Sequence, residues 1–245
     1  IQLENSIEAN NTKISTNDTS DYFGFSFFDV VSATNTPLLD LPLQSDYEIS
    51  LNDNLELLLV GEKNVLIDVR VDLSGNILVP EVGKINLRNL SLTDAEKKVN
   101  SFLSESYIGT KAFLNVKEAS MKKISVIGSV ASPGTYFVNP FVTVSEAIKY
   151  ANGLTQGASL RNIKINRIDG SSINIDMYNF LIDGNLTVDQ NLRNGDTVIV
   201  PATSNFVTVN GQVHRPKIYE YKSEDRVEKL LSFAQGLTNN ANMDN

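Results

Sequence analysis

The sequence predicts an α+β protein made of small mixed sheets, each packed against a single helix, with one such unit present twice. The first observation is an internal repeat. Residues 124–158 align without a gap on residues 207–241, at an offset of 211 − 128 = 83. The second observation is that each copy joins a β-branched apolar run, a turn and an amphipathic helical pattern. A sheet over one helix is the simplest way to bury the apolar stripe of that helix.

Identical residues recur throughout the two copies, from the first strand to the end of the helix. The matched pairs are Gly128–Gly211, Val130–Val213, Pro133–Pro216, Tyr136–Tyr219, Val144–Val227, Ala151–Ala234, Gly153–Gly236, Leu154–Leu237, Thr155–Thr238 and Ala158–Ala241. A long ungapped period of this kind indicates a repeated structural module. We therefore predict that both copies fold as the same strand-turn-strand-helix unit.

Turn and cap residues define the elements of the first copy. Pro133 fixes its own φ and Gly134 has a permissive backbone, which predicts a hairpin turn. Thr143 and Glu146 form a capping box that opens a helix, and Gly153 stands where a left-handed cap ends it. Further strands are predicted at residues 162–168 and 172–175, around the Asp169-Gly170 turn, and at residues 198–200.

The N-terminal part of the chain has a different composition. Residues 1–20 are rich in Asn, Ser and Thr and predict a flexible or surface-draped arm. An aromatic strap, residues 21–29, follows and contains Tyr22, Phe23, Phe25, Phe27 and Phe28. Such a segment must be buried. It either packs on its own domain or forms a subunit contact, and Pro37 and Pro42 then predict an extended linker.

Between this linker and the repeat, the pattern predicts another sheet with one helix. Leu55, Leu57 and Leu59 alternate along a strand, and further strands are expected at residues 65–71, 76–79 and 112–116. A capping box at Thr93 and Glu96 predicts a helix that ends near residue 105.

Two motifs resemble known families. The pattern V-x-G-x-V-x-x-P-G-x-Y, followed by T-V-x-E-A-I-x-x-A-x-G-L-T-x-x-A, resembles the SLBB (soluble ligand-binding β-grasp) domain. The pattern D-x-x-G-x-I-x-x-P-x-x-G at residues 72–83 resembles the polysaccharide export domain, although Ser50-Leu51-Asn52-Asp53 replaces the usual Gly-Pro-Gly-Asp. Residues 46–241 together resemble the Wza-like outer-membrane polysaccharide export family. The motif positions, which we interpret as structural, are Gly75, Pro80, Gly83, Gly128, Pro133, Gly134, Gly153, Gly211, Pro216 and Gly236.

The resemblance implies a domain order and a function. It places an arm and strap at residues 1–45, an export domain at 46–120, one ubiquitin-like β-grasp SLBB domain at 121–203 and the start of another at 204–245. It implies a periplasmic, ring-shaped conduit for capsule polysaccharide or exopolysaccharide, attached to or part of the outer membrane of a Gram-negative bacterium. The implied partners are other copies of the chain, the polysaccharide and an inner-membrane polysaccharide co-polymerase.

Composition gives little support to catalysis, and we predict no catalytic residues, cofactor or metal. The chain has no cysteine and one histidine, His214, whereas metal and nucleophilic sites need clustered ligands. A net charge of −8 and a pI near 4.8 argue against nucleic acid as a partner. No apolar run reaches the roughly 18 residues of a membrane helix, so any spanning segment lies outside this sequence.

The composition also predicts weak polymer binding through many polar contacts. The chain has no tryptophan for sugar stacking and no cluster of arginines to hold an acidic polymer, and its acidic balance would repel one. One alternative to the conduit is a monomeric carbohydrate-binding β-grasp module. A second is a polysaccharide-cleaving enzyme, because two catalytic carboxylates can be far apart in the sequence.

Overall fold

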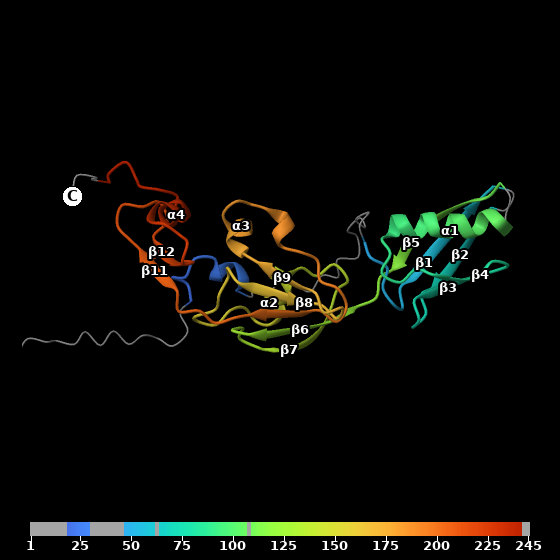
Figure 1. The fold of residues 1–245 in the computed structure, drawn as a ribbon, viewed down its shortest axis with the longest axis horizontal. Helices are drawn as coiled ribbons and strands as arrows, with labels where there is room; N and C mark the ends of the chain where they lie inside the picture. Colours follow the sequence, from blue (N-terminus) through green and yellow to red (C-terminus); the bar gives the residue numbers. More distant parts are fainter. Residues whose placement is uncertain (1–18, 30–46, 62–63, 107–108, 242–245) are drawn as a thin grey trace, which may run out of the picture.

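The computed structural model describes residues 19–29, 47–61, 64–106 and 109–241. They form a row of units, namely a first lobe (residues 47–118), a middle lobe (residues 122–203) and a C-terminal lobe (residues 206–241), as Figure 1 shows. The linker predicted around Pro37 and Pro42, and the arm up to residue 18, lie outside the described residues. One hydrophobic cluster fills the first lobe, and a second is shared by the middle and C-terminal lobes.

The first lobe is a three-stranded antiparallel sheet covered by a helix, with a separate hairpin. The sheet has the order β2-β1-β5 and consists of β1 (Asn54–Val60), β2 (Val65–Arg70) and β5 (Lys111–Glu118). The hairpin is β3 (Asn76–Val79) with β4 (Gly83–Asn86), and the helix is α1 (Leu92–Ser106). Leu55, Leu57 and Leu59 are buried in one cluster with Ala95 and Val99 of α1. The predicted alternation along β1 is therefore confirmed.

The cap of α1 differs from the prediction. Two overlapping cap patterns, Ser91 with Asp94 and Thr93 with Glu96, compete in the sequence. The helix begins at Leu92, and the Asp94 amide donates to Ser91 Oγ at 3.1 Å, so the predicted Thr93 box is wrong. The physical reason is tertiary: Glu96 Oε2 instead accepts a hydrogen bond from the Leu114 amide of β5 at 3.1 Å, which ties the helix to the sheet.

The middle lobe has the β-grasp arrangement. Its sheet has the order β7-β6-β10-β8-β9, with β6 (Lys122–Gly128), β7 (Gly134–Val138), β8 (Ile163–Asn166), β9 (Ser172–Ile175) and β10 (Thr197–Val200). The last strand, β10, lies between two hairpins, parallel to β6 and antiparallel to β8. Helix α2 (Val144–Tyr150) begins with the predicted Thr143–Glu146 capping box. The predicted α+β class with a ubiquitin-like β-grasp unit is confirmed.

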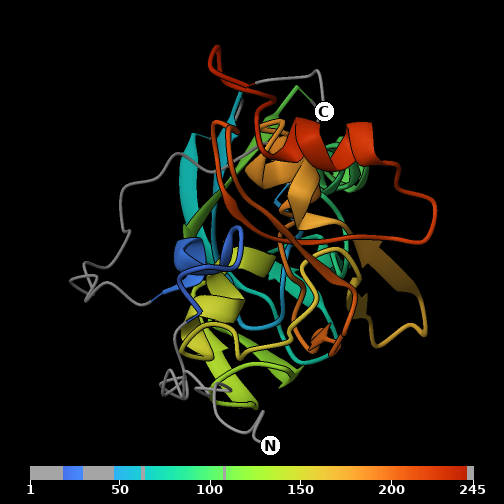
Figure 2. The same cartoon turned by 90° about the vertical axis from the view of Figure 1, so that its left-hand side faces the viewer.

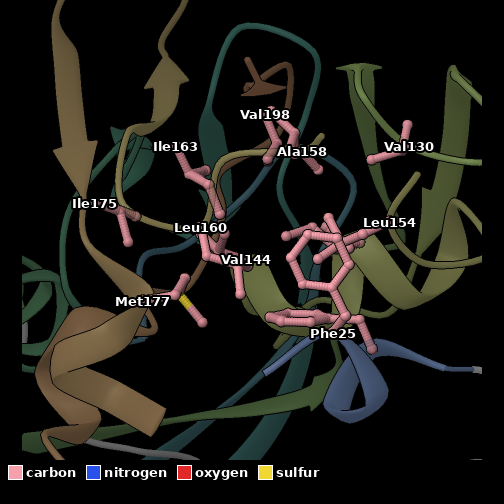
Figure 3. Packing of buried hydrophobic residues seen from close by; sticks show 14 of the residues in the cluster. Phe25, Val130, Val144, Leu154, Ala158, Leu160, Ile163, Ile175, Met177 and Val198 are labelled. Atoms are coloured by element: carbon pink, nitrogen blue, oxygen red, sulfur yellow. The ribbon is translucent and has the colours of Figure 1, made fainter. Parts of the chain in front are cut away.

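The core of the middle lobe lies between this sheet and α2. Figure 3 shows Val144 of α2 in the same cluster as Leu154, Leu160 and Val198. Two short elements between β9 and β10, α3 (Met177–Leu181) and the 3-10 helix η2 (Leu186–Val188), were not predicted. Their apolar runs are too short to show a helical period.

The C-terminal lobe repeats the first part of the middle lobe, as the sequence predicts. It contains β11 (Phe206–Val209), β12 (Lys217–Glu220) and α4 (Val227–Phe233). Its bonds recur at the offset of 83: the Val130 amide donates to Gly128 O and the Val213 amide to Gly211 O, both at 2.9 Å. The Val130–Leu154 bridge likewise recurs as Val213–Leu237, and the Tyr136 hydroxyl bond to Ser132 O recurs as Tyr219 to Arg215 O. The repeat is therefore confirmed at the level of individual bonds.

Both helix-ending glycines have the predicted left-handed backbone, and they form a matched pair. Their φ angles are 82° at Gly153 and 77° at Gly236. A Cβ at Gly153 would lie 3.0 Å from the carbonyl oxygen of Phe28, whereas a Cβ at Gly236 would meet nothing within 4 Å.

We expect Gly153→Ala to lose roughly 2 kcal/mol of unfolding free energy and Gly236→Ala roughly 1 kcal/mol. Both variants lose stability because a residue with a Cβ is disfavoured in the left-handed conformation. Gly153→Ala loses more because its Cβ also displaces the Phe28 carbonyl. Hydrogen–deuterium exchange of α2 and α4 peptides measures each loss in its own lobe. Equal losses would show that the contact with Phe28 does not constrain Gly153.

Candidate functional site

The aromatic strap packs on the middle and C-terminal lobes, not on the first lobe that follows it in the sequence. It contains the 3-10 helix η1 (Phe25–Phe28), and Figures 1 and 2 show it, in blue, beside α2. Phe23, Phe25 and Phe28 are buried in the cluster shared by these two lobes. Phe27 is 39% exposed and Tyr22 is half-buried. The contact with another subunit remains a prediction for this segment.

The strap also extends the C-terminal sheet. The Ile218 amide donates to Asp21 O, and the Phe23 amide donates to Ile218 O, both at 2.9 Å, so that Tyr22 pairs in parallel with β12. The Phe23 ring stacks on Tyr219 and meets Tyr178 edge-on, with centroid distances of 5.1 Å in both cases. Tyr178 belongs to the middle lobe and Tyr219 to the C-terminal lobe, so the strap joins the two.

A buried charge cluster lies at the same junction, around Arg161. Its guanidinium pairs with Asp225 and, through Nε, with Asp176 Oδ2 at 3.1 Å. The arginine residue as a whole is 7% exposed. The Glu220 carboxylate accepts the Leu160 amide at 2.8 Å and the Arg161 amide at 3.0 Å. Backbone donors of the middle lobe therefore bind the side chain of Glu220 in the C-terminal lobe. In return, acceptors of the C-terminal lobe bind the side chain of Arg161 in the middle lobe.

In this cluster burial disfavours the charged form of each group, and local partners favour it. Burial raises the pKa of Glu220 above its ordinary value, although the hydrogen bonds from Ser159 and the Leu160 and Arg161 amides act against the shift. Burial lowers the pKa of Arg161, but the bond to Asp225 and the charge of Asp176 outweigh it, so that pKa is raised. The arginine thus stays charged inside the junction.

Asp53 forms a second buried node, at the junction of the first and middle lobes. It is fully buried and accepts from the Tyr47 hydroxyl at 2.7 Å, from the Ser50 amide at 2.8 Å and from both the amide and hydroxyl of Ser120 at 2.8 Å. Ser120 lies between β5 and β6, where the chain passes from one lobe to the next. Burial, together with the charge of Asp53, raises the pKa of Tyr47. The turn Ser50–Asp53 therefore anchors the connection between the lobes.

A polar cleft of about 680 Å³ opens between the first and middle lobes, with an adjoining hollow of about 320 Å³. Four charged residues line both parts, namely Glu48, Lys122, Arg167 and Arg193. The Arg193 guanidinium pairs with the Glu48 carboxylate across the two lobes. We call this combined space the interlobe cleft.

The cations of the interlobe cleft come from distant parts of the sequence. Lys122 is 8% exposed and donates from Nζ to Leu192 O at 2.7 Å, and its burial lowers its pKa. Arg167 has a buried Nε with no hydrogen-bond partner in the described part of the chain, and Arg88 of the first lobe lines the adjoining hollow. The expectation that no arginine cluster exists is therefore wrong in three dimensions. Sequence reasoning missed it because no two of these residues are near neighbours in the chain.

The motif residues named from the sequence shape turns and do not line the cleft. Gly75, Gly83, Gly128 and Gly211 have φ angles between 84° and 102°. Pro80 follows β3, Pro133 and Pro216 lie in the turns before β7 and β12, and Gly134 begins β7. Their role as structural positions remains a prediction that substitution can test.

The described residues contain no group of three or more His, Cys, Asp or Glu side chains that could hold a metal ion. His214 is exposed in the turn before β12. Within the same part of the chain, no helix is both long and apolar enough to cross a membrane.

A small sheet-and-helix domain followed by β-grasp repeats, with a polar cleft between the first two lobes, defines a modular α+β protein. The family model described as polysaccharide biosynthesis/export protein matches residues 41–117, and SLBB domain models match residues 122–200 and 206–245. The first lobe is therefore similar to the polysaccharide biosynthesis/export family, and the other two lobes are similar to SLBB domains. From here we call the three lobes the export, first SLBB and second SLBB domains.

Two curated relatives agree with this assignment. Both are Escherichia coli proteins named polysialic acid transport protein KpsD, and each is 28% identical to this chain over 219 residues. The match covers 87% of this chain but 38% of each relative, so the chain spans about two fifths of their length. The matched models describe export and SLBB domains and the relatives are named as transport proteins, and none of these is an enzyme.

Proposed function

We propose that this chain is the periplasmic part of an outer-membrane polysaccharide export translocon. Copies of it form a ring-shaped conduit for capsule polysaccharide or exopolysaccharide at the Gram-negative outer membrane. The observation that carries this proposal is the order of one export domain and two SLBB domains, matched over 87% of the chain by a polysaccharide transport protein.

Open sheet edges support assembly into a ring. In the first SLBB domain the outer edge of β7 pairs with no strand of the described chain. The equivalent edge in the second SLBB domain, β12, is already covered by the aromatic strap. An uncovered edge of this kind favours pairing with another chain. A neighbouring copy is the partner that a ring supplies.

The bonds at the two junctions between domains support the same proposal. The Asp53 node and the Arg193–Glu48 pair connect the export domain to the first SLBB domain. The strap and the Arg161 cluster connect the first SLBB domain to the second. Subunits that keep one shape can close a ring with a lumen of constant width. An inner-membrane polysaccharide co-polymerase is the partner we propose at the other end of the pathway.

Assembly is tested by native mass spectrometry and light scattering of the full-length protein with complete domains. We expect a closed homo-oligomer of one defined mass. In the host, deletion of the gene should abolish surface polysaccharide while polymer accumulates in the periplasm. A monomer at all concentrations would favour a carbohydrate-binding module, and release of reducing ends from the polymer would favour an enzyme.

We expect short neutral or acidic oligosaccharides to bind the monomer weakly, with millimolar dissociation constants. A conduit must release what it binds, and hydroxyl and amide groups in water contribute small net free energies each. Calorimetry or ligand-observed magnetic resonance measures the affinity. Micromolar binding at one site, about 8 kcal/mol, would contradict the conduit because it would hold the polymer in place.

A further inference from the structure

We propose that the interlobe cleft between the export and first SLBB domains recognises a carboxylated sugar residue, such as a uronic acid unit within a saccharide chain. This inference rests on the proposed function for the source of the sugar. The binding chemistry rests on the cleft itself.

The lining of the cleft is less acidic than the chain as a whole. The chain carries a net charge of −8, whereas the two parts of the cleft are lined by four cations, Arg88, Lys122, Arg167 and Arg193, and by four carboxylates, Glu48, Asp169, Asp189 and Asp196. Arg193 already neutralises Glu48. Among the described residues Lys122 and Arg167 form no ion pair with a carboxylate, so these two cations can attract an anion.

Arg167 provides the recognition group. Its Nε is buried and has no hydrogen-bond acceptor among the described residues. The neighbouring carboxylates are engaged elsewhere: Asp169 accepts from the Ser171 amide and Asp196 from the Arg193 amide, both at 2.8 Å. A guanidinium fork binds a carboxylate through two parallel hydrogen bonds, and the Nε of Arg167 is a donor that can form one of them.

The walls around these cations fit a sugar ring. Thr187, Gln190 and Asn191 supply hydroxyl and amide groups for sugar hydroxyls along one side. Phe141 and Phe180 supply apolar surface for a ring face. The volume of about 680 Å³ lies within the range of small-molecule sites. A carboxylate with adjacent hydroxyls therefore fits the cleft better than a bare inorganic anion does.

Titration of the isotope-labelled 245-residue chain with trigalacturonate, followed by amide chemical shifts, tests the inference. We expect shifts around Arg167, Asn191 and Arg193 and a millimolar dissociation constant that increases with salt. Maltotriose, which is neutral, and inorganic phosphate should cause much smaller shifts. Equal shifts with either of these two probes would overturn the inference.

Substitutions sharpen the test. Arg167→Gln should weaken trigalacturonate binding about tenfold, the loss expected for one charge-assisted pair. Arg88→Gln, on the export-domain side, should weaken it less, and it provides a second variant if Arg167→Gln perturbs the fold. Arg226→Gln removes the same charge at an exposed position just before α4 and should change nothing. Unchanged binding in both cleft variants would overturn the inference.

The two proposals fail separately. Normal ring assembly and polysaccharide export, combined with no selective binding of trigalacturonate, would overturn the acidic-sugar site alone. Selective binding that Arg167→Gln removes, in a protein that neither forms rings nor supports export, would overturn the translocon and leave the site in place.

Discussion

Gly128→Ala is expected to lose roughly 3 kcal/mol or more of the unfolding free energy of the first SLBB domain. Gly128 has a φ of 94°, and a Cβ there would lie 2.1 Å from the carbonyl oxygen of Val200. Val200 belongs to β10, which pairs in parallel with β6 and forms the centre of the sheet. The left-handed backbone costs roughly 1–2 kcal/mol, and forcing β10 away from β6 adds a similar amount.

The internal repeat supplies a matched control for this variant. Gly211 occupies the same position of the second copy with a φ of 85°, but a Cβ there would meet nothing within 4 Å. Gly211→Ala should therefore lose about 1 kcal/mol, the backbone cost alone. Hydrogen exchange of β6 and β11 peptides reports each domain separately, which matters because a multi-domain chain need not unfold in one step. If the two variants lost equal stability, close approach of β10 would not explain Gly128.

Arg161→Met is expected to lose about 3 kcal/mol and to loosen the second SLBB domain from the first. The change removes the cation that pairs with Asp225. Both side chains of this pair are buried, with exposed fractions of 6% for Arg161 and 8% for Asp225. Removing one partner of a buried ion pair leaves an uncompensated charge, which is the most costly way to break such a pair. The contacts of the guanidinium with the Tyr178 and Phe233 rings, at 5.2 and 5.1 Å, are lost as well.

Lys97→Met is the control for this variant because it removes a cation from an exposed pair. The Lys97 and Asp94 side chains are 73% and 60% exposed, so no measurable loss of stability is expected. Denaturant unfolding followed by circular dichroism measures the change, and limited proteolysis between β10 and β11 reports the loosened junction. An Arg161→Met protein as stable and as protease-resistant as the unaltered chain would show that the strap alone holds the two domains together.

The sequence by itself determined the features that depend on short stretches of chain. The alternation of Leu55, Leu57 and Leu59 specified a strand with one buried face, and Thr143 with Glu146 specified the start of α2. Gly153 and Gly236 specified left-handed helix ends. Each signal lies within a few residues of its effect, so local sterics and local hydrogen bonds are enough to read it. The repeat offset then predicted the second unit from the first.

Tertiary structure decided everything that joins distant residues. Glu96 could have capped the helix locally, but its carboxylate binds β5. Ser91 caps the start of α1 instead. The strap could pack on any apolar surface, and only the assembled core shows that it packs against the SLBB domains. Arg88, Arg167 and Arg193 form a cluster only because the export and first SLBB domains meet at the interlobe cleft. Packing of the two domains brings such residues together, and no periodicity or short motif in the sequence indicates which of them will be in contact.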